Sequence, residues 1–207
     1  MAEQRVDGRT VRYQHRRGEL LAAVMAYVLE HGVTDLSFRP LAQAVGVSHV
    51  TLRHHFGSKE ELVGEIFGAI RRQEAPPPGP VDGDGAEAFI RELWSRWLTP
   101  SGERTFRLLF QAVGQALMHP DRYPRLLSSV VTDWIDIIAR LAVESGCPPE
   151  DAPRFATLLL AQVRGLQLDL LITGDHDRVD AALDTALDAL RDRIDSWPRR
   201  AETTDPR

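Results

Sequence analysis

The sequence contains little of what several classes of protein require. Its 207 residues include a single cysteine, Cys147, which excludes an intrachain disulfide and is typical of a reducing compartment. We therefore expect a cytoplasmic protein. The N-terminus has no apolar signal segment, and we expect no apolar run long enough to span a membrane.

The common motifs of catalysis and of metal binding are also missing. The sequence has no G-x-S-x-G, no Walker A motif, no H-E-x-x-H and no paired cysteines. His49, His54 and His55 are spread around one helix, which makes a poor metal site. The run Asp175-His176-Asp177 is interpreted as helix capping. We expect no catalytic residue, no metal and no cofactor, and hence a protein that is not an enzyme.

Charge is distributed unevenly along the chain. The net charge is −5, of which residues 1–75 contribute +1 and the rest −6. Overall acidity argues against a general nucleic-acid coat protein. Positive charge gathers in residues 1–17, which hold five arginines against two acidic residues. This segment is either a basic arm that follows DNA or a solvated tail.

The segment 36–62 has the signals of two short helices joined by a tight turn. Ser37 is suited to cap the first helix, and Gly46 suits the residue that leaves it with a positive φ. Ser48 is suited to cap the second helix. Residues 58–61, Ser-Lys-Glu-Glu, form a capping box for a third helix. The pattern predicts a helix-turn-helix, a motif that places its second helix in the major groove of DNA.

The helix that follows Ser48 is the expected recognition helix. Arginine pairs bidentately with guanine, histidine donates to bases or phosphates, and valine or threonine methyls contact the thymine methyl. Lys59, at a helix N-terminus, is placed for a phosphate. The predicted DNA contacts are Arg39, Ser48, His49, Val50, Thr51, Arg53, His54, His55 and Lys59. The alternative is that these residues are only the solvated face of a small helical bundle.

A family resemblance supports the DNA-binding interpretation. Residues from about 16 to 70 resemble the DNA-binding domain of the TetR family of bacterial transcriptional regulators, most specifically in TLRHHFGSKEEL at 51–62. The resemblance implies an all-α fold, with an N-terminal three-helix helix-turn-helix domain and a C-terminal helical bundle for ligand binding and dimerisation. It also implies a double-stranded DNA operator as partner, repression as the usual mode, and release by a small-molecule effector.

Two positions depart from the family pattern. The family usually has tyrosine where this chain has Arg53, and a small residue or proline where it has Val50. Arg53 keeps the reach of tyrosine and adds a charge, which is compatible with contact to phosphate or guanine. The alternative function is a ligand sensor with lost or altered DNA binding.

Composition and periodicity divide the chain into five segments. They are a basic arm (1–17), the helix-turn-helix domain (18–74), a Pro/Gly-rich linker (75–85), the ligand-binding and dimerisation domain (86–197) and a flexible tail (198–207). Helices are predicted at 86–98, 104–118, 124–145, 150–172 and 179–197, and no strand is convincing.

The last two long helices are the expected dimer interface. The helix 155–172 is apolar almost all round, so it must be covered on more than one side. In the TetR family the two final helices of each subunit meet their symmetry mates, which implies a homodimer. The residue pattern alone leaves open that both helices are buried within one subunit.

A ligand pocket is expected within the C-terminal bundle, where the TetR family binds its effectors. A site of this kind is mostly apolar with a few polar anchors. The predicted lining residues are Trp94, Phe110, Gln111, Trp134, Gln162 and Gln167; the wider set of candidates adds Trp97, Phe106, Gln115 and Arg164. Gln111 and Gln162 are preferred, because a buried amide needs a partner. They predict a small effector that is uncharged or weakly polar.

Overall fold

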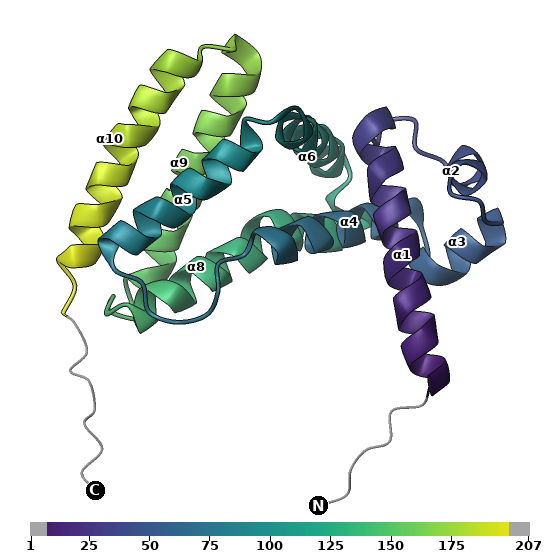
Figure 1. The fold of residues 1–207 in the computed structure, drawn as a ribbon, viewed down its shortest axis with the longest axis horizontal. Coiled ribbons are helices and arrows are strands. Elements are labelled where there is room, and N and C mark those ends of the chain that lie inside the picture. The colour runs from purple at the N-terminus through teal and green to yellow at the C-terminus, as the bar shows by residue number, and fades with distance from the viewer. Residues whose placement is uncertain (1–7, 199–207) are drawn as a thin grey trace, which may run out of the picture.

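The computed structural model describes residues 8–198, and the side chains from residue 16 onward. Within that range every regular element is a helix, which confirms the expected all-α fold. An N-terminal bundle and a C-terminal bundle occupy opposite sides of the molecule in Figure 1, and α4 (Lys59–Glu74) runs from one into the other.

The N-terminal bundle is built on a compact apolar core. Its helices before α4 are α1 (Gly8–His31), α2 (Phe38–Ala44) and α3 (His49–Phe56). Val24 of α1, Leu41 of α2, Leu52 of α3 and Ile66 of α4 are fully buried against one another. Each of these residues lies on the apolar stripe of its helix, so the hydrophobic periodicity fixes how the four helices pack.

Local capping signals set the helix-turn-helix geometry. Gly46 leaves α2 with φ +73°, and the Ser48 hydroxyl accepts from the backbone N–H of Thr51. The capping box at α4 is complete, because Ser58 and Glu61 each accept from the other's backbone N–H. Ser37 stands at the N-cap of α2 in extended backbone but makes no side-chain capping bond.

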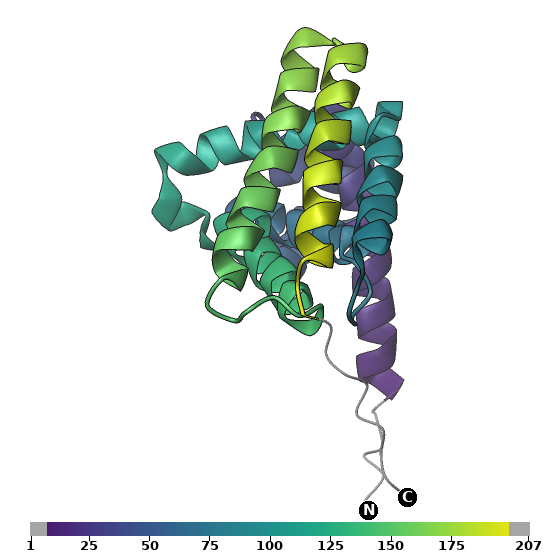
Figure 2. The same ribbon diagram turned by 90° about the vertical axis from the view of Figure 1, so that its left-hand side faces the viewer.

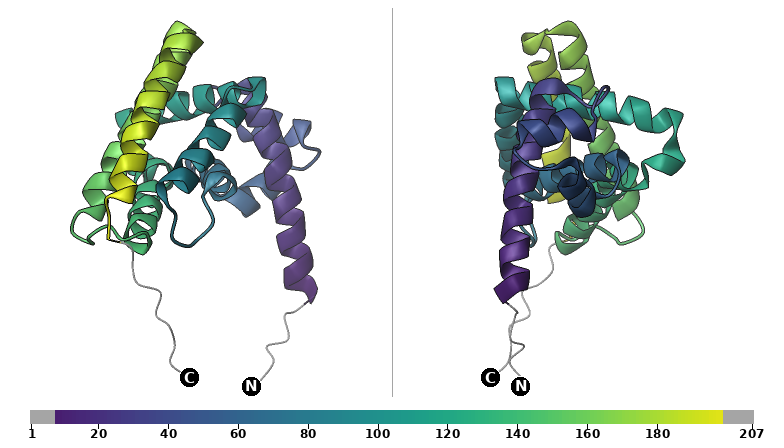
Figure 3. Two further views of the ribbon diagram at one scale, coloured as in Figure 1. Left: turned by 60° about the vertical axis from the view of Figure 1, so that its left-hand side comes forward. Right: turned by 90° about the vertical axis from the view of Figure 1, so that its right-hand side faces the viewer.

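Helix α1 begins much earlier than the sequence predicts. The segment 1–17 is expected as a separate arm, yet the helix starts at Gly8 and continues without a break to His31. Residues 1–7 lie outside the described residues. The right-hand view of Figure 3 shows α1 extending well beyond the rest of the N-terminal bundle. The arginines at positions 9, 12, 16 and 17 are therefore carried on a helix.

The C-terminal bundle follows a short linker. Asp82 caps the next helix by accepting from the backbone N–H of Gly85, so the linker spans 75–82 and the predicted linker end at residue 85 is wrong. The helices are α5 (Gly83–Trp97), α6 (Pro100–Met118), the 3-10 turn η1 (Pro120–Arg122), α7 (Pro124–Leu127), the π-helical turn η2 (Ser128–Thr132), α8 (Asp133–Glu144), α9 (Ala152–Thr173) and α10 (His176–Asp195). The predicted flexible tail, 198–207, lies outside the described residues except for Pro198.

The two bundles are joined tightly where α4 crosses α7. A Cβ atom added at Gly64 would lie 2.8 Å from the Cβ of Arg125, so only glycine allows this approach. Close by, Arg122 of η1 pairs with Glu60 in the first turn of α4. Arg71, further along α4, pairs with Asp133 of α8 at 3.0 Å. Helix α4 is thus held by the C-terminal bundle along most of its length.

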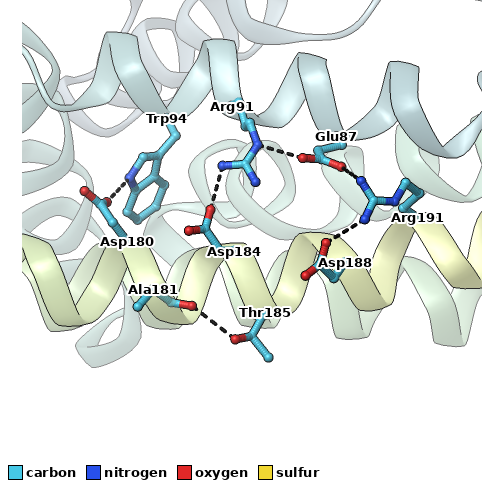
Figure 4. Close-up of polar contacts among 9 residues, drawn as sticks. All are labelled: Glu87, Arg91, Trp94, Asp180, Ala181, Asp184, Thr185, Asp188 and Arg191. Atoms are coloured by element: carbon cyan, nitrogen blue, oxygen red, sulfur yellow. Dashed lines mark hydrogen bonds and ion pairs between the residues drawn. The ribbon is translucent and has the colours of Figure 1, made fainter.

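Helix α10 is fastened to α5 of the same subunit. Figure 4 shows a ladder of polar contacts along this seam: the indole Nε1 of Trp94 donates to Asp180 at 2.8 Å, Arg91 donates to Asp184 at 2.7 Å, and Glu87 accepts from Arg191 at 2.6 Å. The leucines of α10 are buried beneath this ladder. The apolar stripe of α10 is therefore largely used within the subunit.

Helix α9, beside α10 in Figure 2, keeps an exposed apolar face. Leu158 is 62% exposed and Ile172 is 74% exposed. The helix is long and apolar enough to cross a membrane, so the expectation that no run in the chain has that length is wrong. Only 11% of its most apolar 18-residue window is fully buried, and several of its leucines are half-buried against the core, so α9 leaves part of its apolar surface exposed.

Candidate DNA-binding surface and ligand cavity

Helix α3 presents four of the predicted DNA contacts to solvent. His49, Val50, Arg53 and His54 are all exposed, and Val50 is 64% exposed despite its apolar side chain. The opposite face of α3 is fixed in the core by Leu52 and Phe56. Figure 1 places α3 at the edge of the molecule far from α9 and α10, and among the described residues its outer side chains stay exposed.

A shallow hollow beside α3 gathers positive charge. It is lined by Phe38, His49, Arg53, Gly57, Ser58, Lys59 and Glu61. The N-terminus of α4 opens into it, and a helix N-terminus with nearby cations suits a phosphate group. The ammonium group of Lys59 also donates to the carbonyl of Thr34 at 3.1 Å, which leaves it two further donors. The backbone N–H of Ser58 lowers the pKa of the Glu61 carboxyl, so this carboxylate stays committed to its cap.

The other predicted DNA contacts differ in position. Arg39 is exposed in the first turn of α2. The Thr51 hydroxyl lies 2.8 Å from that of Ser48, so both hydroxyls serve the start of α3. His55 is turned inward: its Nδ1 is buried, and burial lowers the pKa of its imidazole. His55 is thus half-buried and less accessible than His49 or His54 for the DNA contact that the sequence predicts.

The C-terminal bundle holds a partly open cavity of about 230 Å³ with an almost wholly apolar lining. Side chains of α4, the linker, α5, α8, α9 and the end of α10 surround it, including three of the four tryptophans: Trp97, Trp134 and Trp197. A mostly apolar space of this kind suits a small ligand. Its size lies just below the usual range of small-molecule sites, about 300–1,000 Å³.

Most of the residues predicted to bind the ligand lie elsewhere. Of the six, only Trp134 lines this cavity. Trp94 faces α10 through its bond to Asp180, Gln162 is exposed on α9, and Phe110 packs against the apolar core. Gln167 is buried beside a second, smaller hollow of about 100 Å³. The predictions for Trp94, Phe110, Gln111, Gln162 and Gln167 as cavity residues are therefore corrected, because helical phase alone does not show which side of a helix meets the cavity.

Gln111 instead joins the two bundles. Its Oε1 accepts from the backbone N–H of Val33 at 3.0 Å, and its Nε2 donates to the Thr34 hydroxyl at 2.5 Å. The α1–α2 turn is thereby tied to α6. We expect Gln111→Ala to lower the free energy of unfolding by about 1 kcal/mol, the usual contribution of such a hydrogen bond, without changing affinity for a cavity ligand. Urea denaturation measures the free energy of unfolding, and calorimetric titration measures ligand affinity. A change in ligand affinity would show that Gln111 does contribute to the ligand site.

Two charged side chains are built into the apolar cavity wall. Glu74 is the last residue of α4, and Arg164 lies in the middle of α9. Burial raises the pKa of Glu74 and lowers that of Arg164 to about 10, and each charge partly offsets the other's shift. The Glu74 carboxylate also accepts from the indole Nε1 of Trp97 at 3.0 Å. The sequence offers no signal that Glu74 turns inward, since it ends a helix in a polar run.

Comparison with known proteins places this geometry in a family. Residues 20–66 match the family described as bacterial regulatory proteins, tetR family. The HTH-type transcriptional repressor KstR2 of Mycobacterium tuberculosis is 43% identical over 52 residues, which are 25% of this chain and 26% of that protein. The matched segment thus spans about a quarter of the curated relative's length.

Solved structures extend the likeness to the whole fold. A transcriptional regulator from Rhodococcus sp. Rha1 has 23% identity and a TM-score of 0.62, over 88% of this chain and 99% of that one. The structure of BioQ with its double-stranded DNA operator has 22% identity and a TM-score of 0.51, over 87% and 98%.

Over the matched segment, the proteins that the chain resembles are transcriptional regulators of the helix-turn-helix type rather than enzymes. Residues 20–66 are similar to the DNA-binding domain of the tetR family, and the chain as a whole has the same fold as the solved Rhodococcus regulator.

Proposed function

We propose that this protein is a ligand-responsive transcriptional repressor that binds a pseudo-palindromic operator as a homodimer and leaves it when a small, mostly apolar effector fills the cavity. The exposed outer face of α3 carries the proposal. A well-folded helix with arginine, two histidines and a bare valine facing solvent has the side chains that read base edges in the major groove. The curated relative over this domain is itself described as a transcriptional repressor.

The proposed homodimer forms through α9 together with α10. A face with Leu158, Leu168 and Ile172 exposed is the surface most in need of a cover. A twofold axis there would set two copies of α3 at a fixed separation, as required by half-sites about 34–36 Å apart or a multiple of it. A soluble regulator of this kind would act in the cytoplasm.

The proposed control runs through α4. This helix starts beside α3 and ends with Glu74 in the cavity wall, so one rigid element contacts both sites. Effector binding displaces the α4 end and changes the separation of the two α3 helices. Effector and operator then oppose each other reciprocally, typically by about 1–3 kcal/mol.

Selection of random duplex DNA by the purified full-length protein, at one near-physiological salt concentration, tests this function. A palindromic motif is the expected product. A folded dimer that selects no sequence, with and without cavity ligands, would contradict the proposal and favour a sensor that no longer reads DNA.

Arg53 is the sharpest residue-level test of DNA reading. We expect Arg53→Ala to weaken operator binding by about 1–3 kcal/mol, because Arg53 is exposed in the hollow beside α3. A base contact would also relax preference at one operator position, whereas a phosphate contact would weaken all sequences alike and lower the salt slope by about 1. Fluorescence anisotropy over a salt series measures both. The matched control is Arg140→Ala, because Arg140 is an exposed arginine on α8. Equal operator affinity in the two variants would show that Arg53 does not contribute to DNA binding.

A further inference from the structure

The cavity wall holds more hydrogen-bond donors than acceptors. Arg164 lines the cavity, and its only hydrogen bond to another described residue runs from Nη1 to Oε1 of Gln167 at 3.0 Å. Trp197 also lines the cavity, and its buried Nε1 has no partner among the described residues. Glu74 offers acceptors, but its carboxylate already accepts a hydrogen bond from Trp97.

The guanidinium group of Arg164 is incompletely paired. Glu74 is near enough to influence its pKa, yet among residues 16–198 no ion pair joins the two side chains. A half-buried charge without a close partner still loses part of its hydration, and a hydrogen bond to one neutral amide offsets only part of that cost. Arg164 and Glu74 are the two charged side chains in a mostly apolar wall, and the guanidinium group of Arg164 has donors left for a bound group.

We propose that the effector is an amphiphilic anion whose acidic head group pairs with Arg164 while its apolar body fills the rest of the cavity. The inference rests on the proposed role of the cavity as the effector site and names the class of effector. A planar guanidinium matches the two oxygens of a carboxylate or phosphate group with parallel hydrogen bonds. The expectation of an uncharged ligand depends on Gln111 and Gln162, and neither lines the cavity.

The cavity volume indicates the size of the part of this anion that the cavity holds. A space of about 230 Å³ holds roughly eight groups the size of a water molecule, at about 30 Å³ each. Such a space fits a straight chain of about eight carbons or a single substituted ring. The tryptophan and leucine side chains around it offer no further charged partner for a second head group.

The same pairing gives the effector a direct effect on α4. An anion on Arg164 satisfies the charge that otherwise attracts Glu74, and it brings a like charge close to the Glu74 carboxylate. Repulsion therefore acts on the last residue of the helix that connects the two bundles. A neutral ligand of equal volume would fill the cavity without this force.

Eight-carbon probes that differ only in the head group test the proposal with the full-length protein and without DNA. Octanoate, octyl phosphate, octanamide and octylammonium are titrated by calorimetry and by tryptophan fluorescence, since three tryptophans line the cavity. We expect at least one of the two anions to bind 10-fold or more tightly than octanamide, with octylammonium weakest. The tighter anion identifies the head group as carboxylate or phosphate.

Three variants locate the pairing. Arg164→Gln should weaken the preferred anion about 10- to 100-fold and change octanamide little, because only the charged contact is lost. Glu74→Gln should strengthen the anion by removing the competing carboxylate. Arg140→Gln, on the exposed side of α8, should leave all affinities unchanged.

Octanamide or octylammonium binding as tightly as both anions to the unmodified protein would overturn the proposal, whether or not the Arg164 variant folds. So would the absence of binding by any probe, or an unchanged preference for the anion in a folded Arg164→Gln protein. Operator selection without ligand is independent of these titrations. If the protein binds the anions but selects no DNA sequence, only the proposed function as a regulator is rejected. If it selects a DNA sequence but shows no preference for anions, only the proposed class of effector is rejected.

Discussion

Replacing Leu158 and Ile172 together with glutamate is expected to convert the proposed homodimer to a monomer and to lower operator affinity by at least 100-fold. Both residues lie on the exposed apolar face of α9, at 62% and 74% exposure, so the change leaves the subunit core intact. Four unpaired carboxylates in one dimer interface carry a desolvation cost of several kcal/mol each. Two linked half-site contacts typically raise DNA affinity 10²- to 10⁴-fold over a single contact, and a monomer loses that increase.

Light scattering after size-exclusion chromatography measures the oligomer, and anisotropy measures operator binding. The matched control is Leu117→Glu with Met118→Glu, which changes two equally exposed apolar residues at the end of α6. A dimer that persists in the α9 variant would rule out this face as the interface. An unmodified protein that is monomeric and partitions into lipid vesicles would show instead that lipid covers α9.

Phe56→Ala is expected to have the largest effect on stability, about 3–5 kcal/mol. Phe56 is 2% exposed at the end of α3, and the guanidinium group of Arg17 lies 5.4 Å from its ring centroid. Truncation leaves a void among α1, α3 and α4 and removes that cation–π contact. Since a whole domain is stable by only about 5–15 kcal/mol, the helix-turn-helix should be largely lost near physiological temperature.

The comparison with Val50 makes the Phe56 test specific. Val50 lies on the same helix but is 64% exposed, so Val50→Ala should change the free energy of unfolding by no more than about 0.5 kcal/mol. Its expected effect is confined to operator preference, through loss of a methyl contact. Chemical denaturation followed by circular dichroism measures both variants. A Phe56→Ala protein as stable as the Val50→Ala protein would show that the α3 core is not packed as described.

Signals that act within a few residues predicted the local geometry well. Gly46 and the pair Ser58 and Glu61 set the turn and the start of α4 as expected, because backbone conformation and capping depend on near neighbours. The burial of Leu52 and Phe56 followed from their four-residue spacing. The start of α1 was missed because Gly18, directly after the predicted arm, does not interrupt the helix, which continues back to Gly8.

The cavity could not be predicted in the same way. Its wall combines residues from the linker and five helices, and their meeting depends on how those helices cross. Gln111 illustrates the difficulty: a polar residue within an apolar stripe needs a partner, but the partner proved to be the α1–α2 turn. Glu74 illustrates the converse, because nothing in its neighbours along the chain indicates that it faces an apolar space.

The position of Gly64 makes α4 a lever with a defined fulcrum. Close contact with α7 at Gly64 leaves five residues of α4 on the side of the recognition helix and ten on the side of the cavity. At 1.5 Å per residue the two arms measure about 8 Å and 15 Å. Under the proposed control, a displacement of Glu74 about this contact is roughly halved at Lys59, and the force there is roughly doubled. The Arg71–Asp133 and Arg122–Glu60 pairs hold α4 on either side of the pivot, so that motion requires both pairs to shift.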